Sequence, residues 1–347
     1  MDLIAYRTIR IYSGYMKDII IVIFCTLLTS CGYQCKPTEQ EQELIRQIEH
    51  VFEVRQQLAE RYWLEFDDKR FSAPVIFFAD SLCYAVNPTE RFLNEFKCER
   101  IKAPRFDLYK TKRLDSAPFH MEMYMNLDTY LKGSLVLCAD TTLVDRTPYV
   151  MCSTLGETRK MFDDISDEKG WIPMVIHELA HGCQYSHPNH YLALQTIEYP
   201  ISTLDFVEYA TKYEWLGEAL VTENEHLLSA IATDNNKEMN EHIRAFLLCR
   251  KNRKEKMKNE FGEDIVKLEE MLERCESLGR YMEVQSAQLL GNDDPKYAED
   301  SLFFSENVRQ AYFFITGYNF IRLFIKLGID LDLPYQSTEH KALEEYI

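Results

Sequence analysis

The sequence has no basic stripe, no C-x-x-C pair and no internal repeat. Its 39 Lys and Arg residues are outnumbered by 56 Asp and Glu residues, which gives a formal net charge of −17. A nucleic-acid-binding protein normally carries a basic face, so we expect no nucleic-acid partner. The absence of a C-x-x-C pair argues against a zinc ribbon or a redox motif. No low-complexity block stands out either.

The composition is that of a globular protein. Of the 347 residues, 46% are hydrophobic, 27% are charged and 13% are aromatic, which is too apolar for a disordered chain. This length suits one large domain or two coupled subdomains, with ample material for a core. The composition does not indicate the oligomeric state.

The apolar run at the N-terminus is too short to span a membrane comfortably. It covers residues 19–28 (IIIVIFCTLL), follows Lys17 and precedes small residues. A basic residue, a short apolar segment and small residues at a cut site are typical of a secretory signal. We therefore expect residues 1–30 to be a signal peptide, with Met16 a more natural start than Met1.

The end of this segment is more specific. The run Leu28-Thr29-Ser30-Cys31 resembles the bacterial lipobox, in which the cysteine is acylated and becomes the new N-terminus. The alternative is a plain signal peptide with a chance cysteine. The resemblance implies an exported lipoprotein, anchored to the bacterial outer membrane through lipid on Cys31, on the periplasmic or the extracellular face. Residues 31–42 are polar and would form the tether.

Cysteine usage is compatible with export but does not fix any pairing. Ten cysteines are present, and removal of Cys25 and lipidation of Cys31 would leave eight. Eight is an even number and an exported chain can form disulfides. Free buried thiols are an equally good interpretation.

Hydrophobic periodicity divides the rest of the chain into two parts. Residues 43–168 contain one long amphipathic helix and then short apolar runs, and residues 169–347 are mainly helical. We predict an α+β fold in which an N-terminal helix and a small mixed sheet precede a helical subdomain. The predicted helices are 43–66, 172–186, 205–231, 236–258, 260–290 and 303–327, and the predicted strands are 74–78, 82–86, 119–125, 134–137 and 149–155.

One motif carries chemistry. Residues 177–181 read His-Glu-Leu-Ala-His, an H-E-x-x-H pattern that follows an apolar helix start. Residues four apart lie one turn apart on the same helix face, so His177 and His181 can bind one metal ion. Glu178 can hold the water at that ion. The alternative is a pair of ordinary histidines on a surface helix.

The sequence resembles the gluzincin group of zinc metallopeptidases. In many of these, a later helix with the pattern W-x-x-E-G/A supplies a glutamate as the third ligand, and Trp215, Glu218 and Ala219 match it. The resemblance implies a Zn²⁺ ion held by His177, His181 and Glu218. Other acids near Glu218 could be the third ligand instead: Glu214, Glu223 and Glu225. His187 and His190 follow the motif closely, but they lack the spacing of the third histidine ligand in metzincins.

The family often has an acid four residues after the ligand glutamate, where it orients a metal-bound histidine. This sequence has Thr222 there instead. A second, weaker likeness lies in residues 311–328, whose Y-x-x-x-x-G-Y form would let Tyr318 stabilise an oxyanion. The other interpretation is that Tyr318 and its neighbours are core aromatics at helical spacing.

The resemblance further implies a zincin-like fold in which an edge strand binds an extended peptide, and residues 149–155 are our prediction for that strand. The implied activity is zinc-dependent hydrolysis of a peptide or protein substrate, with Glu178 as the general base. Two alternatives remain: an inactive zincin-fold lipoprotein that binds a peptide or a protein partner, and a helical scaffold with chance motif residues. Neither cleavage specificity nor endo- versus exopeptidase action follows from the sequence.

Overall fold

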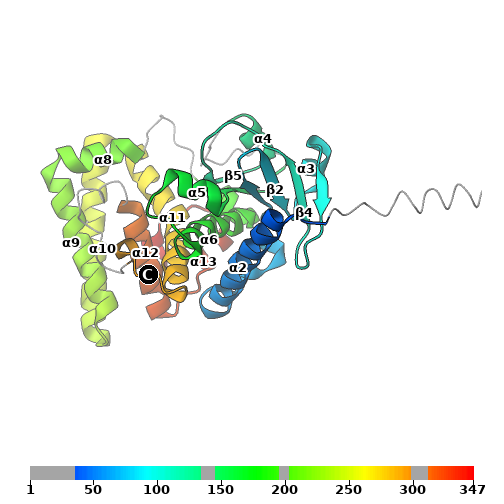
Figure 1. Cartoon of the computed structure of the whole chain (residues 1–347). Coiled ribbons are helices and arrows are strands. Elements are labelled where there is room, and N and C mark those ends of the chain that lie inside the picture. The colour runs from blue at the N-terminus through cyan, green and yellow to red at the C-terminus, as the bar shows by residue number, and fades with distance from the viewer. Residues whose placement is uncertain (1–35, 134–144, 195–202, 298–311) are drawn as a thin grey trace, which may run out of the picture.

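The computed structural model describes residues 36–133, 145–194, 203–297 and 312–347 (Figure 1). The predicted signal peptide 1–30, Cys31, the first part of the predicted tether and the predicted strand 134–137 lie outside the described residues. Among the described residues, no helix combines the length and the apolar character that a membrane span needs. None of the six described cysteines forms a disulfide: Cys83, Cys98, Cys152, Cys183, Cys249 and Cys275.

The fold is α+β. The described helices are α2 (Glu39–Arg61), α3 (Glu90–Glu95), α4 (Leu127–Leu131), α5 (Leu155–Met161), α6 (Glu168–Ser186), α7 (Pro188–Ala193), α8 (Thr203–Lys212), α9 (Glu214–Ala232), α10 (Asn236–Phe261), α11 (Glu263–Leu289), α12 (Tyr312–Leu327) and α13 (Leu333–Gln336). Short 3₁₀ turns include η1 (Leu64–Asp67), η2 (Lys69–Phe71), η3 (Pro295–Tyr297) and η5 (Leu343–Tyr346). In Figure 1, α8, α9 and α10 lie at one end of the molecule and the sheet lies at the other.

The helices predicted at 172–186 and 236–258 are a few residues longer, and residues 303–311 of the last predicted helix lie outside the described residues. Two further differences from the prediction are larger. Helix α2 begins at Glu39, inside the predicted tether, because Thr38 and Glu41 form a capping box. The Glu41 N–H donates to Thr38 Oγ1 over 3.2 Å, and the Thr38 N–H donates to the Glu41 carboxylate over 2.8 Å. The helix predicted at 205–231 is two helices, α8 and α9, with Tyr213 between them in an extended conformation.

The six described strands form one mixed sheet: β1 (Val75–Phe78), β2 (Leu82–Val86), β3 (Glu99–Ile101), β4 (Leu108–Lys112), β5 (Met121–Tyr124) and β6 (Tyr149–Ser153). Their order is β3-β4-β2-β1-β6-β5. The β1–β6 pair is parallel and every other pair is antiparallel.

The prediction that residues 149–155 form the edge strand is wrong. Strand β6 lies between β1 and β5, and all five of its residues are buried, as is typical of a strand with a parallel neighbour in the sheet interior. The edge strands among the described strands are β3 and β5, and the residues of β5, the neighbour of β6, are all only partly buried.

Helix α6 runs beneath β6 and β5 and carries the H-E-x-x-H residues. It begins at Glu168 because the Asp167 carboxylate accepts from the Lys169 and Gly170 N–H groups. Pro173 removes one helical N–H, and the Lys169 carbonyl that this N–H would have reached accepts from Asn292 Nδ2 over 2.9 Å.

Two further contacts fix α6 against the sheet. The Trp171 indole N–H donates to the Ser153 carbonyl at the end of β6 over 3.0 Å. A Cβ added at Gly182 would lie 2.8 Å from Val150 Cγ2 and 2.9 Å from Ala73 Cβ. Glycine at position 182 therefore allows the helix to approach the sheet more closely than any other residue would.

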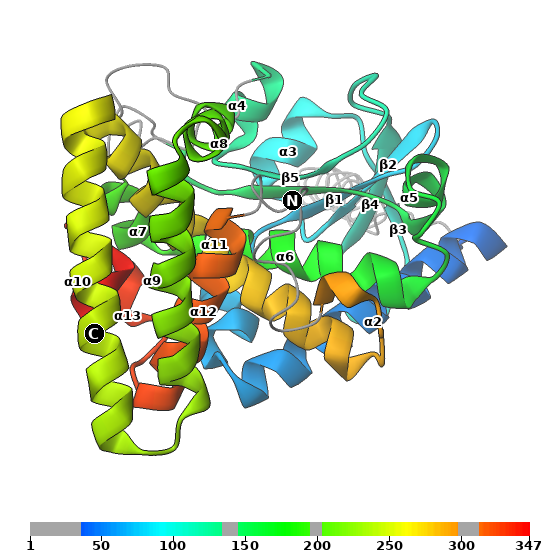
Figure 2. The ribbon, with the colours of Figure 1, turned by 90° about the vertical axis from the view of Figure 1, so that its left-hand side faces the viewer.

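Helix α11 is the central helix of the C-terminal part, and it packs against both α6 and α12 (Figure 2). A Cβ at Gly317 of α12 would lie 2.8 Å from Ser277 Cα, so this glycine permits close packing of the two backbones. The largest core cluster includes residues from α2, the sheet, α6, α11 and α12. The core is thus shared between the two parts of the chain that the sequence separates.

Candidate metal centre

Three ligand-type side chains converge between α6 and α11. His177 Nε2 and His181 Nε2 lie 3.0 Å apart, and each lies 3.3 Å from Glu276 Oε2 on α11. The two histidines are each 8% exposed, and the carboxylate side chain of Glu276 is 16% exposed. The three atoms form a nearly equilateral triangle within the protein.

The other nitrogen of each imidazole is held by an acceptor. His177 Nδ1 lies 3.0 Å from Glu283 Oε2, and His181 Nδ1 lies 2.9 Å from Gln184 Oε1. The Gln184 amide is oriented in turn, because its Nε2 donates to the Tyr335 hydroxyl over 2.8 Å. In the neutral form of each imidazole, a proton on Nδ1 would be donated to the outer acceptor, and the Nε2 lone pair would face Glu276.

The metal-free electrostatics agree with this geometry. Burial alone would lower the pKa of His177, but hydrogen bonds to Glu276 and Glu283 prevail and raise it to about 10. The pKa of His181 is also raised, since the charge of Glu276 outweighs burial. Burial would raise the pKa of Glu276, but both histidines stabilise its negative charge and hold this pKa far below its usual range. The cluster therefore attracts positive charge, as protons or as a cation.

The residues fit a divalent metal ion. Tetrahedral zinc with ligand bonds of about 2.0–2.2 Å has ligand–ligand edges of about 3.3–3.6 Å, close to the sides of this triangle. Two imidazoles and one carboxylate are a common catalytic zinc donor set, and outward acceptors on each Nδ1 are the usual supports of such histidines. The described residues thus present a complete three-ligand set.

Gly279 allows α11 to lie this close to the histidines. A Cβ at this position would lie 3.1 Å from His177 Nε2 and 3.3 Å from His181 Cε1. Gly279 stands between Glu276 and Glu283 on the same face of α11, so one helix face supplies the ligand, the space and the orienting acid.

Glu178 lies beside the triangle, at an open hollow. It is 8% exposed, and burial raises its pKa. The hollow has a volume of about 290 Å³ and is lined by residues of α6, α11, α12 and β5: Met121, Glu122, Met123, His177, Glu178, His181, Tyr185, Cys275, Glu276 and Phe314. Catalytic zinc sites keep one position open for water or substrate, and this hollow provides the space.

The structure does not bring the predicted third ligand, Glu218, to the histidines. Helix α9 packs against α10 and α12 rather than α6, and Glu218 is exposed on its surface. Thr222, the position that departs from the family pattern, donates to the Glu218 carbonyl over 3.0 Å on the same exposed face. The acid that meets the two histidines comes from α11, where Glu276 lies at the place that the sequence pattern assigned to Glu218.

The rival acids on α9 also lie elsewhere. Glu214 and Glu225 are exposed. Glu223 is 2% exposed, but its carboxylate accepts from Arg250 Nη1 and Arg253 Nε, each over 2.7 Å. These buried pairs join α9 to α10, so the role of Glu223 is structural.

Tyr318, the predicted oxyanion donor, lies in the core. It is 4% exposed, its ring centroid is 5.8 Å from that of Tyr281, and the Arg322 guanidinium lies 5.6 Å from the centroid of its ring. The α12 residue that lines the hollow is Phe314, one turn earlier, whose ring centroid is 5.9 Å from that of His177. The geometry matches the core-aromatic interpretation of Tyr318.

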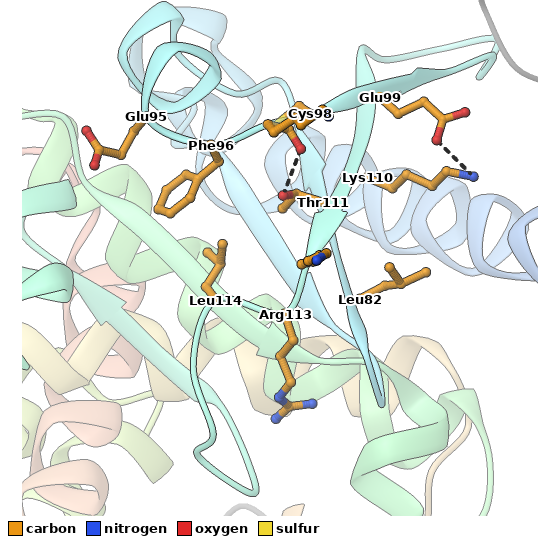
Figure 3. A pocket seen from close by; sticks show the side chains of 11 residues that line it. Leu82, Glu95, Phe96, Cys98, Glu99, Lys110, Thr111, Arg113 and Leu114 are labelled. Carbon is orange, nitrogen blue, oxygen red and sulfur yellow. Dashed lines mark hydrogen bonds and ion pairs between the residues drawn. The ribbon is translucent and has the colours of Figure 1, made fainter.

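A second, larger hollow of about 630 Å³ lies over β3 and β4 (Figure 3). Its wall carries Lys110 and Arg113 together with Glu95 and Glu99, and Cys98 is its one thiol among the lining residues. Burial raises the pKa of Cys98, so this thiol is not activated. No metal-ligand group of the described residues lies in this hollow.

We expect Glu283→Gln to weaken metal binding by about 10–100-fold, because the His177 Nδ1–H would lose its charged acceptor. Arg280 Nη1 pairs with Glu283 Oε1 over 3.0 Å, so the variant also leaves a partly buried cation without its partner. Competition with a zinc chelator of known affinity measures the change. A variant with unaltered zinc affinity would contradict the orienting role of Glu283.

No protein-family model matches the chain, and no curated protein or solved structure matches it significantly. The likeness to gluzincins therefore depends on the residues and geometry described above.

Proposed function

We propose that this protein is a zinc-dependent peptidase that hydrolyses a peptide or protein substrate. The observation that carries the proposal is the convergence of His177 Nε2, His181 Nε2 and Glu276 Oε2 beside Glu178 at an open hollow. Without a metal ion the site would hold its positive charge as protons on the imidazoles, and a divalent ion bound by the same three atoms would displace those protons.

A bound zinc ion supplies Lewis acidity, which acidifies water and polarises a carbonyl. The chain's own residues do the rest. Glu283 and Gln184 fix the two imidazoles, and Glu276 adds the negative charge that favours a cation. Glu178, whose pKa is raised by burial, takes a proton from water in the hollow and delivers it to the leaving amine. A raised pKa suits this carboxylate to both steps.

Strand β5 supports a peptide as the substrate. Met121, Glu122 and Met123 line the hollow, and no described strand lies beyond β5. The Ser153 N–H donates to the His120 carbonyl over 2.7 Å, so the backbone groups of His120 point toward β6. Successive residues of an antiparallel strand point their backbone groups to opposite sides, so those of Met123, three residues later, point away from β6. An extended peptide can pair with that outer edge and pass Glu178.

The lipobox-like sequence adds a location to this proposal: an exported enzyme anchored to the bacterial outer membrane through Cys31. The alternative of an inactive peptide-binding protein was based on position 222, where this sequence has a threonine and the family often has an acid that orients a histidine. Because Glu283 on α11 takes that orienting role here, this reason for expecting inactivity no longer applies.

A digest of a broad peptide library tests the activity. We expect cleavage that is abolished by a chelator and restored by stoichiometric Zn²⁺, because the described residues that line the hollow include no exposed thiol: Cys275 there is 1% exposed. Glu218→Gln, on the exposed face of α9, is the control and should cleave normally. Binding of peptides without cleavage under any zinc condition would favour the inactive alternative.

A further inference from the structure

A second group of metal-ligand side chains lies away from the candidate peptidase site. Glu65 of η1, His187 just after α6 and Asp332 just before α13 each offer one ligand atom, and these atoms lie within 4.8 Å of one another. The three residues come from remote parts of the chain. The group therefore lies where the N-terminal part, the end of α6 and the C-terminal segment are in contact.

The histidine of this group lacks a hydrogen bond at the nitrogen that faces the acids. His187 is 5% exposed, and its Nε2 has no hydrogen-bond partner. Glu65 Oε2 lies 3.1 Å away, but it too is buried and makes no hydrogen bond. The imidazole cannot turn away freely, since it stacks on Phe71 with ring centroids 3.9 Å apart. Two buried polar atoms without hydrogen bonds are expensive unless a ligand satisfies them.

The two acids also lie close to each other without a neutralising cation. One oxygen of Asp332 accepts from the Trp63 indole N–H, which fixes that carboxylate. Arg70, the nearby cation, donates to Asp68 through both Nε and Nη2 instead.

We propose that Glu65, His187 and Asp332 bind a second divalent transition-metal ion, of the zinc or manganese type, in a structural site. One imidazole with two carboxylates is a mixed nitrogen and oxygen set that suits these ions. The side chains of Glu65 and Asp332 are only partly buried, so water can complete the coordination.

An ion at this position would stabilise the packing of three chain segments. It would fasten the start of α13 to the end of α6 and to η1, three segments that no disulfide joins among the described residues. Helix α13 carries Tyr335, whose hydroxyl holds the Gln184 amide that orients His181. If the proposed peptidase site is correct, the second ion also stabilises the support of one of its histidines.

Metal content of the purified full-length protein tests this site. The protein is stripped with a chelator, dialysed against Zn²⁺ and analysed for zinc per chain by mass spectrometry. We expect two equivalents, and one after Asp332→Asn, which keeps an acceptor for the Trp63 indole. Asp330→Asn is the matched control, because Asp330 is an exposed neighbouring acid outside the group, and it should retain two. Glu65→Gln provides an independent second variant and should also retain one.

A His177→Ala background separates this site from the peptidase site. There we expect one equivalent, and none when Asp332→Asn is added. Zinc should raise the melting temperature of His177→Ala but not that of the double variant. Equal zinc content in Asp332→Asn, Glu65→Gln and the unsubstituted protein would overturn the second site. Loss of zinc only on His177→Ala would do the same while leaving the peptidase proposal intact.

Discussion

Glu276→Gln is expected to remove one equivalent of zinc from the protein and to abolish peptide hydrolysis. The substitution keeps the size of the side chain but takes away the negative charge that lies 3.3 Å from both His177 Nε2 and His181 Nε2. Removing a residue that only orients a ligand costs about 10–100-fold in metal affinity, and removing a ligand itself should cost more than about 100-fold. Zinc analysis after dialysis measures the loss.

Glu218→Gln is the matched control for this prediction. It is the same change on the exposed face of α9, at the residue that the sequence pattern favoured. We expect it to keep both the zinc and the activity of the unsubstituted protein. If Glu218→Gln lost the zinc and Glu276→Gln kept it, α9 would be the ligand helix and the arrangement of α11 described here would be wrong.

The second large effect is expected for Glu178→Gln. Glutamine preserves the shape at the hollow but cannot accept a proton from water, so kcat/KM should fall by about 10²–10⁴-fold, or about 3–5 kcal/mol in activation free energy. Zinc content should be unchanged, because Glu178 is not one of the three convergent ligands. Parallel zinc analysis and peptide kinetics on the same preparation separate the two properties.

Retained activity in this variant would contradict the proposal. A Glu178→Gln protein that retained most of its activity would exclude Glu178 as the general base. Besides the proposed ligand Glu276, the hollow contains the carboxylate of Glu122 of β5, but it accepts from the Met121 N–H over 2.8 Å and lies 2.6 Å from His120 Nδ1. These contacts hold Glu122 in place on β5, which is why Glu178 is the base that we propose.

The sequence predicted the part of the site that depends on local geometry. His177, Glu178 and His181 lie within one turn of one helix, and helical spacing alone puts the two imidazoles on one face. The structure places both imidazoles together and buries all three residues. The α+β class and the long helices also followed from periodicity, because each of these patterns is complete within a short window.

The third ligand could not be predicted in the same way, because it depends on which later helix packs against α6. Two helices carry suitable acids, and the W-x-x-E-A pattern favoured Glu218 on α9. A pattern on α11 was present: Glu276, Gly279 and Glu283 lie on one face of the helix, although α11 also buries other acids, such as Glu269 and Glu273. Two acids with a glycine between them on one helix face indicate a polar contact with a neighbouring element, which the glycine allows to lie close to the helix.

The edge strand was mispredicted for a related reason, and the sequence could not decide between the two interpretations of Tyr318. Strand order in a sheet is a long-range property, and residues 149–153 form a strand as expected but lie in the interior. Aromatic residues at helical spacing occur equally in a core and at a site, and packing against Tyr281 places Tyr318 in the core. Only the arrangement of α6, α11, α12 and β5 around the hollow separates these cases.

The most direct test of the zinc site is an anomalous difference map from crystals of the zinc-loaded protein, recorded at the zinc absorption edge. The geometry described here predicts a peak about 2.0–2.2 Å from His177 Nε2, His181 Nε2 and a Glu276 carboxylate oxygen, with Glu178 beside it. A map with no peak at the two histidines, or with a peak there held by an acid of α9, would contradict it.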